Sequence, residues 1–112
     1  MPNKINILKK RSDFLNIRLK GSVYKSNNLI LQKLFDEKLN NSIRVGYTAT
    51  KKIGSAVKRN RAKRLMRELI KDSKIFDKGV NFSYVLIAKK SILETPYKSL
   101  KEELKNLLNK WK

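Results

Sequence analysis

IRVGYTAT, residues 43–50, is the stretch that most clearly decides the fold of this chain. Apolar and polar side chains alternate along it, as they do on a β-strand with one face in a core. The apolar positions that would share the buried face are Ile43, Val45, Tyr47 and Ala49. The sequence therefore predicts a half-buried strand here.

The next stretch, KKIGSAVKRNRAKRLMRELIKD at residues 51–72, changes from strand to helical periodicity. Gly54 predicts a turn, and from Ser55 to Asp72 the apolar residues recur at helical spacing. The predicted apolar stripe consists of Ala62, Leu65, Met66, Leu69 and Ile70.

Upstream, a short helix and another strand are expected. Ser12 is placed to cap a helix that Gly21 would end. Its apolar side would consist of Phe14, Leu15 and Ile17. Residues 28–35 are largely apolar and predict a strand, and the polar residues 36–42 predict a loop.

Downstream, residues 80–88 are rich in β-branched and aromatic side chains and continuously apolar from Tyr84, which is typical of a strand covered on both faces. Thr95 is expected to cap a last helix, with Pro96 in its first turn. The stripe of that helix would contain Tyr97, Leu100, Leu104, Leu107, Leu108 and Trp111.

These elements predict one domain over residues 1–112, because the chain is too short for two cores. We expect an α+β fold, a two-layer α/β sandwich in the order αβββαβα. Its mixed sheet would have about four strands and would pack with three helices.

Composition restricts the possible functions. The chain has 28 Lys and Arg against 9 Asp and Glu, a formal net charge of +19, which favours a polyanionic partner. Cysteine and histidine are absent, which excludes disulfides, thiolate or imidazole catalysis and most zinc sites. The start, MPNKIN, lacks a signal-peptide pattern, and no segment has about 20 consecutive apolar residues, so we expect a cytoplasmic protein without membrane contact.

The helix predicted over residues 55–72 carries most of the functional signal. Opposite its apolar stripe, one arc would hold Asn60, Lys63, Arg64, Arg67 and Lys71. Residues 51–67 contain eight cations and no acid, whereas an ordinary solvated helix face mixes both signs. Arginine forks suit the phosphates and bases of nucleic acid. The candidate RNA-binding residues are Arg59, Asn60, Arg61, Lys63, Arg64, Arg67 and Lys71.

The same region carries a family resemblance. RVGYTATKKIGSAVKRNRAKRLMRE, residues 44–68, is similar to the signature of the bacterial ribonuclease P protein family. The likeness extends to Leu8-Lys9-Lys10, Asp13-Phe14 and Gly21 at the front, and to residues 85–90 and the closing helix behind. Nearly the whole chain is covered.

The resemblance implies a role without catalytic residues in this chain. The partners would be the catalytic RNA of ribonuclease P and precursor tRNA, with one protein monomer per RNA. The chain would be an enzyme only as the protein subunit of this endoribonuclease, because RNA-bound Mg²⁺ would drive removal of the 5′ leader. It also implies that the basic helix lies in a left-handed crossover between parallel strands, against the general preference.

The resemblance further implies a cleft between the first helix and the sheet that binds the single-stranded leader. The positions of this chain that match the leader-binding cleft are Phe14, Arg18 and Gln32, together with Lys51, Lys52, Lys89 and Lys90, which match basic positions that flank it. Many relatives have an aromatic where this chain has Arg18, and some have a tyrosine where it has Gln32, so leader contacts would be more polar here. The alternative for Phe14 is an ordinary core residue.

Two other functions are compatible with the sequence. A basic ribosomal or nucleoid protein would have the same composition, and only the ordered motif argues against it. A membrane-surface or chaperone-like module would be expected to bind anionic vesicles about as well as structured RNA.

Overall fold

Within residues 5–110, which are the ones that the computed structural model describes, five strands form one mixed sheet. The strands are β1 (Ile5–Ile7), β2 (Ser22–Lys25), β3 (Leu29–Phe35), β4 (Ile43–Ala49) and β5 (Phe82–Ala88). Their order is β1-β4-β5-β3-β2, with β1 and β5 parallel to β4 and with β2 and β5 antiparallel to β3. The α+β class is confirmed, and the sheet has one strand more than expected because the three-residue β1 is too short to leave a periodic signal.

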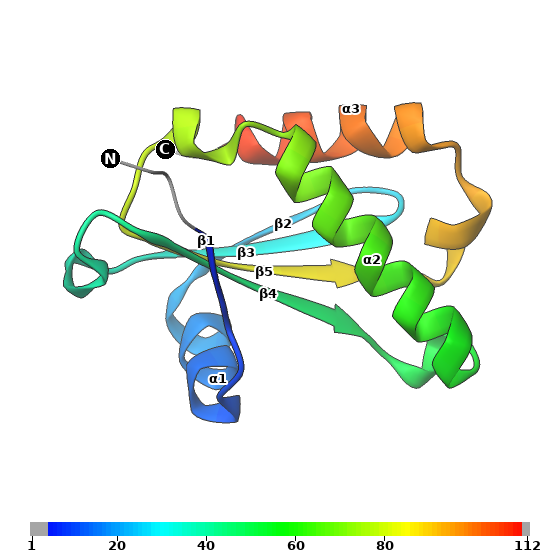
Figure 1. Cartoon of the computed structure of the whole chain (residues 1–112), viewed down its shortest axis with the longest axis horizontal. Coiled ribbons are helices and arrows are strands. Elements are labelled where there is room, and N and C mark those ends of the chain that lie inside the picture. The colour runs from blue at the N-terminus through cyan, green and yellow to red at the C-terminus, as the bar shows by residue number, and fades with distance from the viewer. Residues whose placement is uncertain (1–4, 111–112) are drawn as a thin grey trace.

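Three helices lie on the two faces of this sheet (Figure 1). They are α1 (Arg11–Lys20), α2 (Ala56–Asp72) and α3 (Tyr97–Leu108). The sheet and the pair α2 and α3 form the expected sandwich, while α1 lies on the opposite face. Short 3₁₀ turns connect these elements: η1 (Glu37–Leu39), η2 (Lys51–Ile53), η3 (Ile75–Lys78) and η4 (Lys90–Glu94).

Helix α2 connects the parallel neighbours β4 and β5. In Figure 1 the sheet runs from β1 near the viewer to the paler β2 behind, both β4 and β5 point to the right, and α2 lies above them. The chain therefore leaves β4, passes upward through α2 and returns to β5, which lies behind β4. With both strands pointing to the right, this connection is a left-handed crossover. The handedness therefore agrees with what the resemblance implies and departs from the usual rule.

The alternation of β4 explains the main core. Ile43 and Val45 are fully buried on the face that meets α2 and α3, where they pack with Tyr84 and Leu86 of β5. The apolar stripe of α2 closes this core as predicted, with Ala62, Met66, Leu69 and Ile70 buried. A smaller cluster of Leu8, Ile17 and Val85 lies on the α1 face, so β5 is covered on both sides.

The start of α2 follows from its sequence. Gly54 has φ +134°, a conformation that side-chain-bearing residues rarely adopt, and it turns the chain out of η2. Ser55 is the N-cap, and its hydroxyl accepts a hydrogen bond from the Lys58 backbone N–H at 3.3 Å. This turn fixes where the basic helix begins.

Two predicted helix caps are wrong. Helix α1 begins at Arg11, so Ser12 lies inside its first turn and Lys10 is the N-cap without a side-chain bond. Pro96, not Thr95, is the N-cap of α3. The Thr95 hydroxyl is instead 3.0 Å from both the Ser91 carbonyl oxygen and Asn28 Oδ1. Gly21 ends α1 as predicted, and Trp111 lies outside the described residues.

A polar cluster ties the β2–β3 turn to α3. The Glu103 carboxylate accepts hydrogen bonds from Ser26 Oγ at 2.7 Å, from the Asn28 backbone N–H at 2.9 Å and from the Asn28 side-chain amide. Burial alone would raise the pKa of Glu103, but these hydrogen bonds outweigh it and lower the pKa. The carboxylate therefore stays charged and holds the hairpin against the helix.

Candidate nucleic-acid interface

The outward side of α2 is a cationic face, which we define by Asn60, Arg61, Arg64, Arg67 and Lys71. All five side chains are exposed, opposite the buried stripe. The arc was predicted to include Lys63, but Lys63 is half-buried and lies toward α1. Arg59 is also half-buried.

Nothing in the described structure neutralises this cationic face. Across residues 5–110 the one ion pair joins Arg44 and Asp13, away from α2. Of the two acids of α2, Asp72 accepts a hydrogen bond from the Tyr97 hydroxyl of α3 at 2.6 Å, and Glu68 forms no ion pair with the described cations. The cations are thus left for an external partner, which argues against a simple solvated surface.

Two residues at the start of α2 offer donors with no acceptor within the part of the chain described here. Arg59 Nε is shielded from solvent and makes no hydrogen bond there. The exposed Asn60 amide also makes no hydrogen bond that the described residues provide. A phosphate or ribose of a bound nucleic acid could supply acceptors for the exposed Asn60 amide, whereas Arg59 Nε would be reached only after its side chain moved outward.

A cleft of about 630 Å³ separates α1 from the sheet. It brings together three of the predicted leader-cleft residues: Phe14 and Arg18 from α1 and Gln32 from β3. Its floor includes Val85 and Ile87 of β5. The other residues that line it were not predicted to do so: Lys9, Arg11, Leu15, Tyr47, Thr48, Ala49 and Lys63.

Some of these missed residues left a signal in the sequence. Lys9 and Arg11 belong to the basic run of residues 9–11, which leads into the first turn of α1, and Thr48 lies on the polar side of the alternating strand β4. The inward position of Lys63 has no such signal, because it depends on how α2 crosses the sheet.

Phe14 forms part of the inner wall of the cleft. Its ring packs against Gly46, where a β-carbon would stand 2.5 Å from ring atoms Cε1 and Cζ. The neighbouring Asp13 pairs with Arg44 at 3.3 Å, and Arg44 Nε donates to Ser83 Oγ at 3.1 Å. The ring is half-buried and still lines the cleft, so Phe14 combines a packing role with a partly accessible aromatic ring.

The four predicted lysines outside the helices do not line the cleft. They follow the paired residues Ala49 and Ala88, so they gather at one end of the parallel strands β4 and β5. Lys51, Lys52 and Lys90 are exposed, whereas the Lys89 ammonium donates to the Ser26 carbonyl oxygen at 2.5 Å. They flank the cleft region rather than forming its wall.

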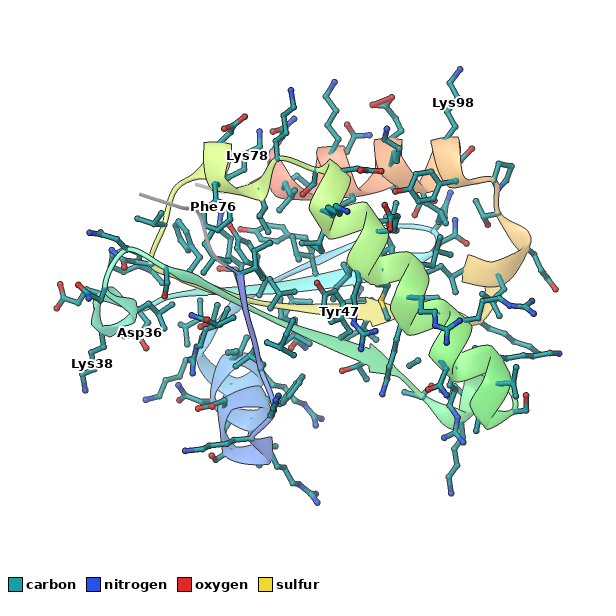
Figure 2. The ribbon with its side chains drawn as sticks, in the orientation of Figure 1. Asp36, Lys38, Tyr47, Phe76, Lys78 and Lys98 are labelled. Carbon is teal, nitrogen blue, oxygen red and sulfur yellow. The ribbon has the colours of Figure 1, made fainter. Side chains whose placement is uncertain are left out.

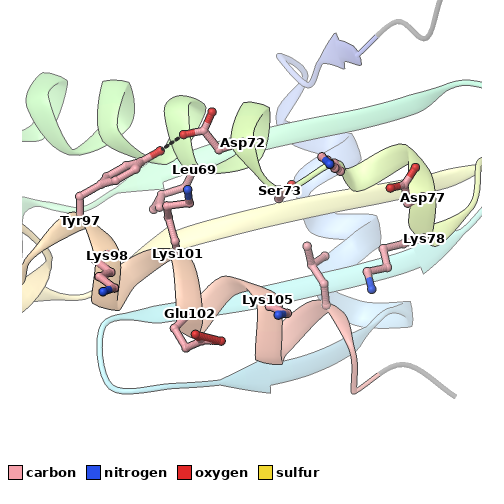
Figure 3. A pocket seen from close by; sticks show the side chains of 12 residues that line it. Leu69, Asp72, Ser73, Asp77, Lys78, Tyr97, Lys98, Lys101, Glu102 and Lys105 are labelled. Atoms are coloured by element: carbon pink, nitrogen blue, oxygen red, sulfur yellow. Dashed lines mark hydrogen bonds between the residues drawn. The ribbon is translucent and has the colours of Figure 1, made fainter.

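A further hollow of about 690 Å³ lies between the end of α2, η3 and α3 (Figure 3). Its lining alternates lysines with Asp72, Asp77 and Glu102, and its Tyr97–Asp72 hydrogen bond connects the two helices. This mixed charge contrasts with the cationic face.

Residues 5–110 contain neither a metal-binding cluster nor a membrane-spanning helix. No group of three or more acidic side chains could hold a metal ion there. No helix in that range is both long and apolar enough to cross a bilayer.

Comparison with known proteins connects this geometry to one family. The family model described as Ribonuclease P matches residues 1–112. The ribonuclease P protein component of Bacillus velezensis is 35% identical over 107 residues, covering 96% of this chain and 90% of that protein. That of Paramagnetospirillum magneticum is 36% identical, covering 93% and 80%.

Solved structures agree. The ribonuclease P protein of Thermotoga maritima superposes with a TM-score of 0.81 at 25% identity, covering 96% of this chain and 98% of that one. The Staphylococcus aureus protein gives a TM-score of 0.79 at 26% identity, covering 95% and 94%. By sequence and by fold, the chain belongs to the bacterial ribonuclease P protein family.

Proposed function

We propose that this chain is the RNA-binding subunit of ribonuclease P, which binds the catalytic RNA through the cationic face of α2 and the 5′ leader of precursor tRNA through the α1 cleft. One observation carries the proposal: Lys63 of the basic helix lines the α1 cleft, so the helix that bears the cationic face also contributes to the wall of the cleft. A protein built this way can hold two RNAs side by side.

The cationic face suits a folded RNA. Arg61, Arg64 and Arg67 repeat at helical spacing and remain exposed, so their guanidinium groups can bind successive phosphates. Each phosphate contact releases counterions, which makes binding favourable at moderate salt and weaker at high salt. Asn60 adds a neutral group that can bind a 2′-hydroxyl.

The α1 cleft suits a single strand. Phe14 offers a ring on which one base can stack. Arg18 offers a planar, positively charged guanidinium group, and Gln32 offers an amide that can hydrogen-bond to base edges. Lys9 and Arg11 place two further cations along the path of the strand. These groups favour an extended leader over a duplex.

The chain's own chemistry indicates binding rather than cleavage. It has no histidine or cysteine, and in its described part no acids gather into a metal site. Hydrolysis would depend on Mg²⁺ held by the catalytic RNA. The protein would lower the repulsion between two polyanions and position the scissile bond, in the cytoplasm and as one monomer per RNA.

Reconstitution tests this function. Precursor tRNA is incubated with ribonuclease P RNA at low Mg²⁺, with and without the protein, and mature 5′ ends are quantified. Because the protein replaces part of the charge neutralisation that Mg²⁺ otherwise supplies, we expect strong stimulation at low Mg²⁺ and a smaller effect at high Mg²⁺. A lack of stimulation at any Mg²⁺ concentration would leave a basic ribosomal or nucleoid protein as the better explanation.

A further inference from the structure

A groove of about 320 Å³ lies between β1 and the second half of α2, and it shares Tyr47 with the lining of the α1 cleft. We call it the β1–α2 groove and define it by Ile7, Tyr47, Phe76, Arg67, Lys71 and Lys74. Figure 2 shows Tyr47 beneath α2 and Phe76 near the upper end of β1. The floor is apolar and aromatic, the rim has three cations, and none of the residues lining it is acidic.

The groove exists because β1 is a short edge strand. It pairs with β4 only over residues 43–45, so the edge of β4 beyond Val45 has no neighbouring strand. Ile7 marks this end and is 47% exposed. A single exposed apolar residue is ordinary, but here an isoleucine and two aromatic rings share one hollow beside three cations.

Arg67 and Tyr47 provide a site for a flat ligand. The guanidinium carbon of Arg67 lies 5.7 Å from the centre of the Tyr47 ring, within the range of a cation–π contact, and the side chain is otherwise exposed. Burial raises the pKa of Tyr47 to about 12, although nearby Arg67 opposes this shift. The phenol therefore remains a hydrogen-bond donor at neutral pH.

Size and charge restrict the occupant. Small-molecule pockets span about 300–1,000 Å³, so this groove is at the lower end and suits one nucleotide better than a folded element. The rim cations would neutralise phosphates on either side of an inserted base. Arg67 and Lys71 also belong to the cationic face of α2, so the groove is continuous with the surface assigned to the catalytic RNA.

We propose that the β1–α2 groove receives one unpaired nucleobase of the catalytic RNA, which contacts Arg67 and the apolar, aromatic lining. This inference rests on the proposed function and adds to it a contact with a base. Phosphate contacts alone position an RNA without reading it, whereas a base in a shaped hollow fixes the register of α2 along the RNA.

The test compares two neutral substitutions at edge-strand positions of similar exposure. Ile7→Ser shortens an apolar side chain that lines the groove. Val23→Ser makes the equivalent change on the opposite edge strand β2, where Val23 is 45% exposed. Affinity for the catalytic RNA alone is measured over a range of salt concentrations. Unpaired bases are mapped with dimethyl sulfate in the free RNA and in each complex. Circular dichroism confirms that both variants fold.

We expect Ile7→Ser to bind at least about fivefold more weakly, because the serine loses the apolar contact that the isoleucine would make with the base, with Val23→Ser within about twofold of wild type. Neither variant removes a charge, so the salt slope should stay unchanged. One unpaired base that wild type protects should become reactive with Ile7→Ser. Arg67→Lys, which keeps the charge but loses the planar stacking surface, should expose the same base.

The outcomes separate this inference from the proposed function. If wild type binds the RNA and stimulates cleavage but Ile7→Ser and Arg67→Lys leave every protected base protected, the groove holds no base and only the inference fails. A weaker complex whose salt slope becomes shallower would also overturn it, because a phosphate contact would then explain the loss. Failure of wild type to bind would instead contradict the proposed function.

Discussion

The ring of Phe14 lies over the backbone of Gly46, so close that a β-carbon at position 46 would be 2.5 Å from two ring atoms. Gly46 is in β4 and Phe14 is in α1, and both elements belong to the region that forms the cleft. The absence of a side chain at position 46 therefore determines how deeply the ring can sit. The depth of the cleft depends on this pair.

Replacing Gly46 with alanine should destabilise the fold and change the cleft. The new methyl group would push against the Phe14 ring, and overpacking of this kind costs about 1–3 kcal/mol. The free energy of unfolding, measured with urea, should fall by that amount. A stability equal to wild type would mean that α1 moves without cost and that the contact does not define the cleft.

Replacing Phe14 with leucine should weaken leader binding specifically. Leucine keeps the apolar contact with Gly46 but offers no ring for stacking, which contributes about 1–3 kcal/mol per base. The affinity of the reconstituted enzyme should fall for precursor tRNA and stay unchanged for mature tRNA without a leader. Equal losses for both RNAs would indicate a general folding defect.

Replacing Arg61 and Arg64 with alanine should make the affinity for RNA depend less steeply on salt concentration. If each contacts one phosphate, the slope of log K against log salt should decrease by about 0.7–0.9 per residue. Lys98→Ala, which removes an exposed cation from α3, is the matched control and should leave the slope unchanged. Similar slopes for Arg61→Ala/Arg64→Ala and wild type would exclude this face as the RNA contact.

Lys33 should make the free energy of unfolding depend on pH in the alkaline range. Its side chain is 2% exposed, and its ammonium lies 4.3 Å from the centre of the Phe82 ring. Burial, reinforced by the charge of Lys78, lowers its pKa from 10.5 to about 8. Between these values the unfolded chain holds a proton that the folded chain has released, so stability should rise with pH.

The test compares wild type with Lys33→Met. The free energy of unfolding of each is measured from pH 7 to 9.5, a range below the titration of the buried tyrosines. The free energy of unfolding should rise less with pH in the variant than in wild type, because the variant lacks the contribution of Lys33 and all other groups respond equally in both. The variant should also be at least as stable at pH 7, since it no longer buries a charge. Parallel curves would show that the pKa of Lys33 is not lowered by folding.

Much of the fold was predictable because local patterns and tertiary burial agree. The alternation of residues 43–50 and the stripe of Ala62, Met66 and Leu69 both describe faces that the structure buries. The cap at Thr95 failed because its hydroxyl is close to Asn28, 67 residues away in sequence. Strand β1 has only three residues, and it pairs with β4 across almost 40 residues of chain.

The candidate site was predictable where charged residues of one sign cluster in the sequence. The cations of α2 could be identified because no acid interrupts them, and the structure leaves them exposed. The cleft required knowledge of tertiary packing, since α1, β3, β4, β5 and α2 all contribute to it. No sequence pattern could place Lys63 in the cleft or Arg67 over Tyr47, because both positions follow from the crossing of α2 over the sheet.

The most direct measurement is the affinity of the purified chain for ribonuclease P RNA at about 0.15 M salt, where exposed charges act over only about 8 Å. An unrelated folded RNA of equal length and anionic vesicles serve as competitors. We predict tight binding to ribonuclease P RNA that neither competitor displaces and that Arg61→Ala/Arg64→Ala weakens. Binding no stronger than to the unrelated RNA or the vesicles would contradict it.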